Sequence, residues 1–346
     1  MSKIIVVTGV TGVQGGSVAR TFLQLPDWHV RGITRNPSGA AAQALAAQGV
    51  EIVRADLDDK VSLARAFGGA HAIFSNTDFF THLSRATQPG AVQLPPGHSA
   101  GEYAYGREVE QGVNVAEAAS SPSVLRTLER FVVSSLSEAS KWSRGKHATV
   151  YHFDSKAAML RAARERFPRV AALTSTLQMG HYVENWKSLP SAGPRRRRPD
   201  GSSGGFVLTR TSDPSFEMPF VVAHKDTGAF VKALVVDLPA GKDLVGVSEY
   251  MTLPAWAELW GRVHGVDVEY RQVSSEELFE GVPEPLMREI RDGFDYIHEF
   301  GLTGGDPDVL EPSQLDFKIP VTSMEEYIRN EDWSAILNPL VPVSED

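Results

Sequence analysis

Closely spaced glycines mark the first place in the chain where a ligand could be held. The segment TGVTGVQGG, from Thr8 to Gly16, follows an apolar run and precedes residues with helical spacing. Glycines at these intervals permit a tight turn, let the backbone approach a diphosphate and let the helix pack on the strand. The amide groups and the dipole at the start of that helix favour phosphate charge. The pattern predicts a dinucleotide pyrophosphate site whose residues are Gly9, Thr11, Gly12, Gln14 and Gly15.

An arginine follows the second apolar run. Arg35 lies in the sequence GITRNP, at a position where sites for NAD usually place an acidic residue that binds the ribose 2′-hydroxyl. A guanidinium there can instead pair with the 2′-phosphate of NADP. The sequence therefore favours NADP(H) as the cofactor. The alternative is a solvated arginine at the end of a strand.

Polar residues also end later apolar runs. Ligands of doubly wound sheets bind at the carboxyl ends of the strands, so residues at these ends are expected to line the cofactor. Polar residues also end strands for purely structural reasons, and that alternative stays open. The predicted cofactor-lining residues of this kind are Asp56, Leu57, Asn76, Thr77, Asp78, Phe79 and Ser134.

A lysine in a predicted helix is the main candidate for chemistry. Lys156 ends the segment YHFDSK, which starts at Tyr151 and leads into a helix after the fifth apolar run. A lysine here can hydrogen-bond the nicotinamide ribose and assist an adjacent proton donor through its charge. His152 lies four residues earlier and shares the same helix face. We predict that Lys156 binds the cofactor and takes part in catalysis; the alternative is that both are ordinary helix residues.

These candidates require a scaffold of alternating strands and helices. Six short apolar runs have the length of buried strands, and residues with helical spacing fill the gaps between them. Such alternation predicts a parallel sheet with helices on both faces, because parallel strands need crossover connections. The predicted fold is α/β, a Rossmann doubly wound parallel sheet with a smaller C-terminal α+β region. The predicted strands comprise residues 4–8, 29–34, 50–53, 71–75, 130–135 and 170–174.

The regular alternation predicts an NADP(H)-binding Rossmann domain in residues 1–178. Residues 179–346 would mainly bind substrate or a partner, with a segment at about 220–250 returning to the Rossmann domain. Residues 79–105, rich in proline and aromatic residues, are predicted to form a long loop of the kind that covers a ligand. Later predicted elements are a helix from Asp226, a strand at 243–247, a helix capped by Thr252, a strand at 266–273 and a helix at 276–300.

The composition excludes several classes of protein. The 346 residues include no cysteine, which removes disulfides and thiolate sites, and the histidines lack metal-binding spacing, so no metal is expected. The net charge of −9 gives no general attraction to nucleic acid or anionic membranes. No apolar run reaches about 18 residues, the length that a membrane span requires. We expect a cytoplasmic protein with no nucleic-acid or membrane partner.

One basic run departs from this acidic background. Arg195, Arg196, Arg197 and Arg198 follow a proline and precede the segment PDGSSGG. Flanks of this composition predict an exposed loop with solvated arginines. Contact with a phosphate, a nucleic acid or a partner protein is the alternative.

Considered jointly, several of these segments resemble the NmrA-like family of atypical short-chain dehydrogenases/reductases. The resemblance covers most of the chain and implies an NADP-binding domain followed by a smaller substrate or partner region. Some members of this family reduce quinones, dyes or secondary metabolites with NADPH, and others bind the cofactor without turnover as redox sensors for transcription regulators. The segments are GVTGVQGGS from Gly9, TRNP from Thr34, DLDD from Asp56, NTDF from Asn76, HFDSK from His152, GHYVEN from Gly180 and DTG from Asp226.

The chain departs from the superfamily pattern at the expected proton donor. The wider superfamily uses a Tyr-x-x-x-Lys pair, and His152 occupies the tyrosine position relative to Lys156. The resemblance therefore implies a reductase without that tyrosine. In such a reductase the proton donor could be Lys156, His152, Tyr151 or a substrate-side residue such as His181 or Tyr182.

Two functions stay open on the sequence. One is an NADPH-dependent reductase of a small aromatic or conjugated carbonyl, quinone, imine or enone of secondary metabolism, because aromatic side chains suit a planar ligand. The other is a non-catalytic NADP(H) redox sensor that regulates a transcription factor through protein contact. The residues predicted to bind the substrate are Phe80, His181, Tyr182 and Trp186.

Overall fold

The chain folds into two compact units. The computed structural model describes residues 2–88, 90–189, 192–197 and 204–338. The first unit comprises Met1–Gly180, Ala223–Gly246 and Pro283–Val321. The second comprises His181–Val222, Val247–Val282 and Thr322–Asp346. The functions assigned to the two predicted domains stay predictions.

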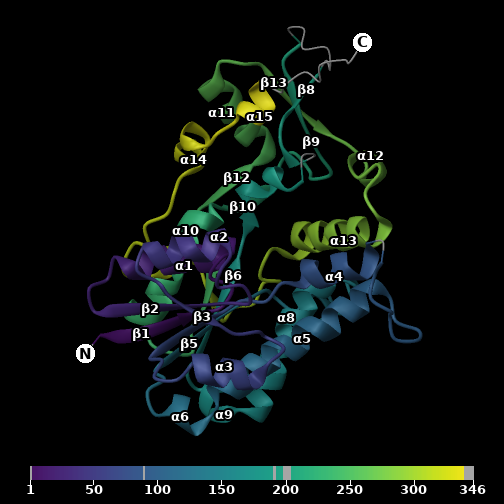
Figure 1. The fold of residues 1–346 in the computed structure, drawn as a ribbon. Coiled ribbons are helices and arrows are strands. Elements are labelled where there is room, and N and C mark those ends of the chain that lie inside the picture. The colour runs from purple at the N-terminus through teal and green to yellow at the C-terminus, as the bar shows by residue number, and fades with distance from the viewer. Residues whose placement is uncertain (1, 89, 190–191, 198–203, 339–346) are drawn as a thin grey trace, which may run out of the picture. The chain divides into compact units, whose positions relative to one another are not determined.

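An eight-stranded parallel sheet forms the centre of the first unit (Figure 1). Its order is β3-β2-β1-β4-β5-β6-β11-β14, which confirms the predicted doubly wound sheet. The chain reverses direction across the sheet between β1 and β4, and Rossmann sheets bind ligands at such a reversal. The strands are β1 Lys3–Val7, β2 Trp28–Thr34, β3 Glu51–Arg54, β4 Ala72–Ser75, β5 Arg130–Ser135, β6 Thr174–Met179, β11 Asp243–Gly246 and β14 Val309–Leu310.

Helices cover both faces of this sheet (Figure 1). Helices α1 and α10 pack together on one face, and α3, α5 and α8 lie on the other. The longer helices are α1 Val13–Leu23, α2 Ala40–Ala47, α3 Lys60–Ala66, α4 Phe79–Thr87, α5 Ala100–Ala119, α8 Tyr151–Arg166, α10 Ala223–Lys232 and α13 Glu284–Phe300. Shorter elements are α6 Pro122–Leu125, α7 Ala139–Trp142, α9 Pro168–Ala171, the π-helical η3 Ala233–Asp237 and the 3-10 turn η4 Pro312–Gln314.

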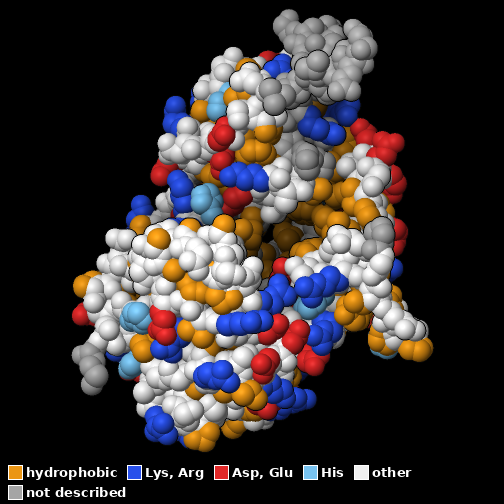
Figure 2. Space-filling view, viewed as in Figure 1, with side chains coloured by type: hydrophobic (Ala, Val, Ile, Leu, Met, Phe, Trp, Pro, Cys, Tyr) orange, Lys and Arg blue, Asp and Glu red, His pale blue; other side chains and the backbone are white. Residues whose placement is uncertain are grey.

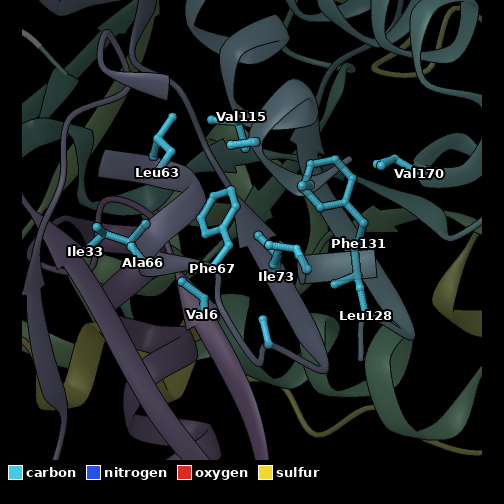
Figure 3. Close-up of a cluster of buried hydrophobic side chains, with 14 of the residues drawn as sticks. Val6, Ile33, Leu63, Ala66, Phe67, Ile73, Val115, Leu128, Phe131 and Val170 are labelled. Atoms are coloured by element: carbon cyan, nitrogen blue, oxygen red, sulfur yellow. The ribbon is translucent and has the colours of Figure 1, made fainter. Parts of the chain in front are cut away.

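The core of the first unit lies between the sheet and the helices α3, α5 and α8. Phe67, Ile73 and Phe131 are enclosed there with aliphatic side chains from all three helices (Figure 3). Burial of this apolar surface is the main force that holds the helices on the sheet. The strands that carry the candidate residues are therefore held in place by a buried hydrophobic core.

Residues 79–105 are mostly helical, so the predicted long loop is wrong. Asp78 caps α4 by accepting a hydrogen bond from the Thr81 amide at 3.1 Å. Ser99 and Glu102 form a reciprocal capping box at the start of α5. These caps satisfy amides that a helix start otherwise leaves open, and they offset the many prolines and glycines between the two helices.

The strand predicted at 170–174 is also wrong. Val170 belongs to α9, which begins at Pro168, and β6 begins at Thr174. Proline is favoured in the first turn of a helix, so the apolar run continues as a helix instead of a strand. All six residues of β6 are buried although most are polar, because their hydroxyls have partners. Thr176, for example, donates to Asp243 at 2.6 Å.

The remaining element predictions hold with shifted ends. The first five predicted strands are confirmed within one or two residues, as are the strands at 243–247 and 266–273 and the Thr252 cap. The predicted helix at 276–300 is divided into α12 Ser275–Leu278 and α13, with Pro283 at the start of the second. Helix α10 begins at Ala223, three residues before Asp226.

The second unit is smaller and has two three-stranded sheets. Their orders are β12-β10-β7 and β13-β9-β8. The strands are β7 His181–Tyr182, β8 Arg195–Arg196, β9 Phe206–Arg210, β10 Glu217–Val221, β12 Glu249–Thr252 and β13 Val268–Gln272. The helices are η1 Val183–Lys187, α11 Leu253–His264, α12, α14 Met324–Asn330 and α15 Ser334–Leu337.

The basic run is more structured than the predicted exposed loop. Arg195 and Arg196 form β8, and the Arg195 guanidinium donates to the Thr209 hydroxyl at 2.8 Å. The Arg196 guanidinium donates to the Leu337 carbonyl, and Arg197 forms ion pairs with Asp267 and Glu269. The loop prediction is therefore wrong for the first two arginines, and Arg198 lies outside the described residues.

Acidic and basic side chains are interspersed on the face that Figure 2 shows. No helix among the described residues has both the length and the apolar character needed to cross a membrane. Within the same residues, no group of three or more histidine or acidic side chains could hold a metal ion.

Candidate active site

Hydrogen bonds connect the glycine turn after β1 to the residue that follows β4. The Asn76 amide donates to the Thr8 hydroxyl at 2.9 Å, and that hydroxyl lies 3.1 Å from Asn76 Oδ1. Gly9 has φ of +57°, and a Cβ atom there would lie 2.7 Å from Asn76 Oδ1. Both the conformation and the space therefore require glycine. Thr8 and Asn76 together fix the backbone at the point where the sheet reverses.

Helix α1 begins with an open first turn. Gly12 is its N-cap residue, in an extended conformation, and it provides no side-chain hydrogen bond to the first amides. Thr11 and Gly12 are exposed and Gln14 is half-buried. A Cβ atom on Gly15 would overlap the Gly9 carbonyl oxygen, so a larger residue would push the helix away from the turn. The predicted pyrophosphate residues are therefore gathered at one accessible turn.

Arg35 follows β2 directly and is exposed. Its guanidinium makes no hydrogen bond or ion pair with any residue that the structure describes. In contrast, the nearby Arg31 binds Glu51 at 2.9 Å and the carbonyl oxygen of Gly68 at 2.8 Å. Arg35 is therefore an exposed cation at the end of a strand.

Other predicted cofactor residues make local structural contacts. The Asp56 carboxylate accepts from the Asp58 amide at 3.1 Å, and the Leu57 carbonyl accepts from Asn114 at 3.0 Å. Phe79 is buried in an apolar cluster with residues of α4 and α5, and Ser134 is buried within β5. These contacts give each of the four residues a structural role that requires no ligand. Their assignment to the cofactor stays a prediction.

Lys156 is held in a buried polar cluster at the carboxyl end of β4. Its ammonium lies 2.8 Å from Glu108 Oε1, 3.2 Å from the Thr77 hydroxyl and 3.4 Å from the Thr77 carbonyl. Thr77 donates to the same Glu108 oxygen at 2.6 Å, and Ser155 donates to the other oxygen. The Glu108 side chain is fully buried and that of Lys156 is 13% exposed. Lys156 and Thr77 are the partly exposed members of this cluster.

Glu108 was not among the residues predicted from sequence. It lies on the buried stripe of α5 that also contains Ala104, Gln111 and Val115. A carboxylate on such a stripe needs a cationic or hydrogen-bonding partner, because an isolated buried charge is strongly unfavourable. That position on the stripe is the pattern that could have revealed it.

His152 pairs with a second buried carboxylate. Its Nδ1 atom lies 2.6 Å from Glu289 Oε1, and its main-chain amide donates to the same oxygen at 2.7 Å. The Glu289 side chain is 3% exposed and that of His152 is 15% exposed. The ring of Phe80 lies 5.2 Å from the imidazole. Glu289 was also missed, since it belongs to α13, far along the chain.

Tyr151 lies in a less favourable environment for proton transfer. Its ring packs against Gly101, where a Cβ atom would come within 2.6 Å of it, and lies 6.3 Å from the Tyr105 ring. Burial raises the pKa of the Tyr151 phenol above its usual range. A tyrosine in this environment is a weaker acid than a solvated one.

The predicted substrate residues are divided between the two units. Phe80, in the first unit, is 39% exposed and lies beside His152. His181 and Tyr182 form β7 of the second unit. Trp186 is 8% exposed, stacks on Trp333 at 4.5 Å and donates to the Tyr327 hydroxyl at 2.9 Å. Packing accounts for Trp186, and its role in substrate binding stays a prediction.

The sheet order, the glycine turn and the lysine at the sheet edge define a Rossmann-fold protein with a candidate dinucleotide site. Residues 1–333 match the NmrA-like family, and the chain belongs to that family. The family resemblance predicted from the sequence motifs is therefore confirmed.

Three similar proteins illustrate the range of this family and fold. An NmrA-like family domain-containing oxidoreductase, cpsB of Aspergillus campestris, is 27% identical over 294 residues, which cover 81% of this chain and 79% of that protein. The negative transcriptional regulator NmrA, in complex with NADP, superposes with a TM-score of 0.68 at 22% identity and covers 95% of both chains. An NADPH-dependent quinone oxidoreductase from Escherichia coli, complexed with NADPH, has a TM-score of 0.62 at 22% identity and covers 94% of this chain and 98% of its own. The two structures establish the shared fold.

Proposed function

We propose that this chain is an NADPH-dependent reductase of a small aromatic or conjugated organic compound. The observation that carries the proposal is the ammonium of Lys156, held by Glu108 and Thr77 at the carboxyl end of β4. A lysine fixed at this edge suits a hydrogen bond to the nicotinamide ribose. The similar proteins include an oxidoreductase and an NADPH-dependent quinone oxidoreductase, which supports this class of reaction.

The residues of the first unit fit NADP(H). The turn from Gly9 to Gly15 would receive the pyrophosphate on backbone amides, because Gly12 presents no side chain there. The exposed Arg35 would bind the 2′-phosphate, a contact for which its lack of other partners leaves it available. NADPH, when bound, would supply a hydride to the substrate. The predicted Asn76, Thr77 and Ser134 would line the same edge.

His152 is the proton donor that we propose for this reduction. Its imidazole is partly exposed, is held by Glu289 and lies one helical turn before Lys156. Tyr151 is less suitable because burial raises its pKa. His181 is also unsuitable, since burial and the neighbouring Arg210 lower its pKa to about 4 and leave it without a proton to donate at neutral pH. Phe80, beside His152, would contact a planar substrate.

The test is NADPH oxidation against a panel of quinones, ketones, imines and enones. We expect turnover with at least one class, and a loss of about 100-fold in kcat for Lys156→Arg with NADPH binding retained. Arginine keeps a cation beside Glu108 but replaces the compact ammonium. Lys60→Arg, at an exposed lysine paired with Glu117, is the matched control. Tight NADPH binding without turnover on the whole panel would contradict the reductase.

A redox sensor is the second candidate, and the likeness to NmrA over 95% of both chains favours it. A sensor would bind NADP⁺ and NADPH with different affinity and present a surface to a transcription factor. It would consume no NADPH. Calorimetric titration with each nucleotide in parallel with the turnover assay separates the two functions.

A further inference from the structure

The buried carboxylate of Glu289 makes two contacts with one residue. Its Oε1 atom accepts from the main-chain amide of His152 at 2.7 Å and lies 2.6 Å from His152 Nδ1. A main-chain amide can only donate, so Oε1 acts as an acceptor in that contact. An ionised carboxylate only accepts hydrogen bonds, so in the contact with this oxygen Nδ1 is the donor. Glu289 is thus placed to select one tautomer of the imidazole.

The surroundings of His152 fix the orientation of its ring. The Phe80, Phe79 and Phe153 rings lie 5.2, 6.0 and 4.8 Å from the imidazole centre. On the α13 side, Gly293 leaves just enough space, since a Cβ atom there would lie 2.9 Å from His152 Cε1. A ring flip would move Nδ1 away from Glu289 and leave a buried carboxylate with one contact fewer, which is unfavourable.

The other nitrogen of the imidazole, Nε2, is available for proton transfer. Nε2 makes no hydrogen bond with any residue that the structure describes. When the Nδ1 proton is held by a carboxylate, Nε2 becomes the atom that gains and loses a proton. The same division of roles occurs wherever a carboxylate orients a catalytic histidine.

We propose that Glu289 is a positioning residue that keeps a proton on His152 Nδ1, so that the imidazolium donates its Nε2 proton to the substrate and returns to the neutral Nδ1–H tautomer. This inference rests on the proposed function, in which His152 donates the proton. It assigns a role in the reaction to α13, a helix that the chain adds to the Rossmann unit through the segment Pro283–Val321. Glu289 touches neither substrate nor cofactor and acts through His152 alone.

Nitrogen-15 NMR of the imidazoles tests the proposal directly, with His152→Asn used to assign the signal. In the wild-type protein we expect the shifts of the Nδ1–H tautomer. In Glu289→Gln, whose amide can donate as well as accept, we expect a mixture of tautomers. An Nε2–H tautomer in the wild type would overturn the inference even if the protein reduces substrates. This measurement also decides the matter if the variant does not fold.

Kinetics supply the second readout. Glu289→Gln should lower kcat by about 10- to 100-fold, the range that a misplaced general acid produces, while the Kd of NADPH changes less than about twofold. Glu289→Asp, which keeps the charge but is shorter, should recover part of the loss. Glu284→Gln, at an exposed glutamate on the same helix, is the control and should retain full activity.

The two hypotheses fail in different ways. A wild-type Nδ1–H tautomer in a protein that oxidises no NADPH contradicts the reductase and still supports the contact between Glu289 and His152. An active enzyme in which Glu289→Gln keeps both the tautomer and kcat overturns the positioning role and leaves the reductase intact.

Discussion

The two units of this chain contain different kinds of buried ionisable group. In the first unit, the carboxyl groups of Glu108 and Glu289 are buried and accept hydrogen bonds from residues of another helix. In the second unit, burial lowers the pKa of His181 to about 4 and that of Arg210 to about 10, so charge is disfavoured. Removing one partner of a buried ion pair strongly destabilises a fold, whereas a group with a depressed pKa makes stability depend on pH.

Aromatic residues show the same contrast. In the second unit Trp186, Trp256 and Trp260 all pack against Trp333 and are buried. In the first unit Phe80 is exposed and lies beside a polar imidazole. An aromatic residue next to a partnered histidine is therefore a better candidate for substrate binding than one within a cluster of tryptophans.

The largest effect that tests this contrast concerns the buried ion pair. Lys156→Met leaves Glu108 buried and without its cation, and we expect a loss of about 3–5 kcal/mol in the free energy of unfolding. The double variant Glu108→Gln, Lys156→Met should recover most of that loss but no activity. Urea denaturation measures both. A single variant as stable as the wild type would show that the pair carries no retained charge.

Acid pH should act on the second unit through His181. Its folded pKa of about 4 lies below the unfolded value of 6.5, so only the unfolded state binds a proton between these values. Stability is therefore complete above about pH 6.5 and falls by up to about 3 kcal/mol as the pH decreases to 4. His181→Gln should remove this part of the pH dependence. If the free energy of unfolding depends on pH in the same way in both proteins, His181 is solvated in the folded state.

The smallest effect concerns Trp186, whose indole donates to Tyr327. Trp186→Phe removes that donor and should destabilise the protein by about 1–3 kcal/mol. NADPH affinity and KM for the substrate should not change, since the residue serves packing. Thermal unfolding and steady-state kinetics measure the two effects. A higher KM for the substrate at unchanged stability would instead indicate that Trp186 binds the substrate.

The sequence predicted the first unit much better than the second. The first five strands each contain a short apolar run, such as Ile5, Val6 and Val7 of β1, and their positions could be assigned from the sequence alone. Strand β6 could not, because four of its six residues are polar, and Ser175 and Thr176 find their hydrogen-bond partners at Lys242 and Asp243 only when the chain folds. The short strands of the second unit, β7 and β8, have two residues each and leave no periodic pattern.

Site residues on turns and strand ends were predictable, but their partners were not. Gly9, Arg35 and Lys156 belong to local patterns that a reader of the sequence can recognise. Glu108 and Glu289 lie 48 and 137 residues from the side chains that they hold. Such pairs arise from the packing of distant helices, and a single sequence carries no record of that packing.

The central claim is that Arg35 and the glycine turn bind NADP(H), and a comparison of two nucleotides tests it most directly. Titration calorimetry with NADPH and NADH, on the wild type and on Arg35→Ala, separates the 2′-phosphate from the rest of the cofactor. We predict that the variant loses about 10- to 100-fold in affinity for NADPH, the effect of removing hydrogen bonds to a charged group, and less than about twofold for NADH. Equal losses for both nucleotides, or no heat of binding in the wild type, would contradict the account.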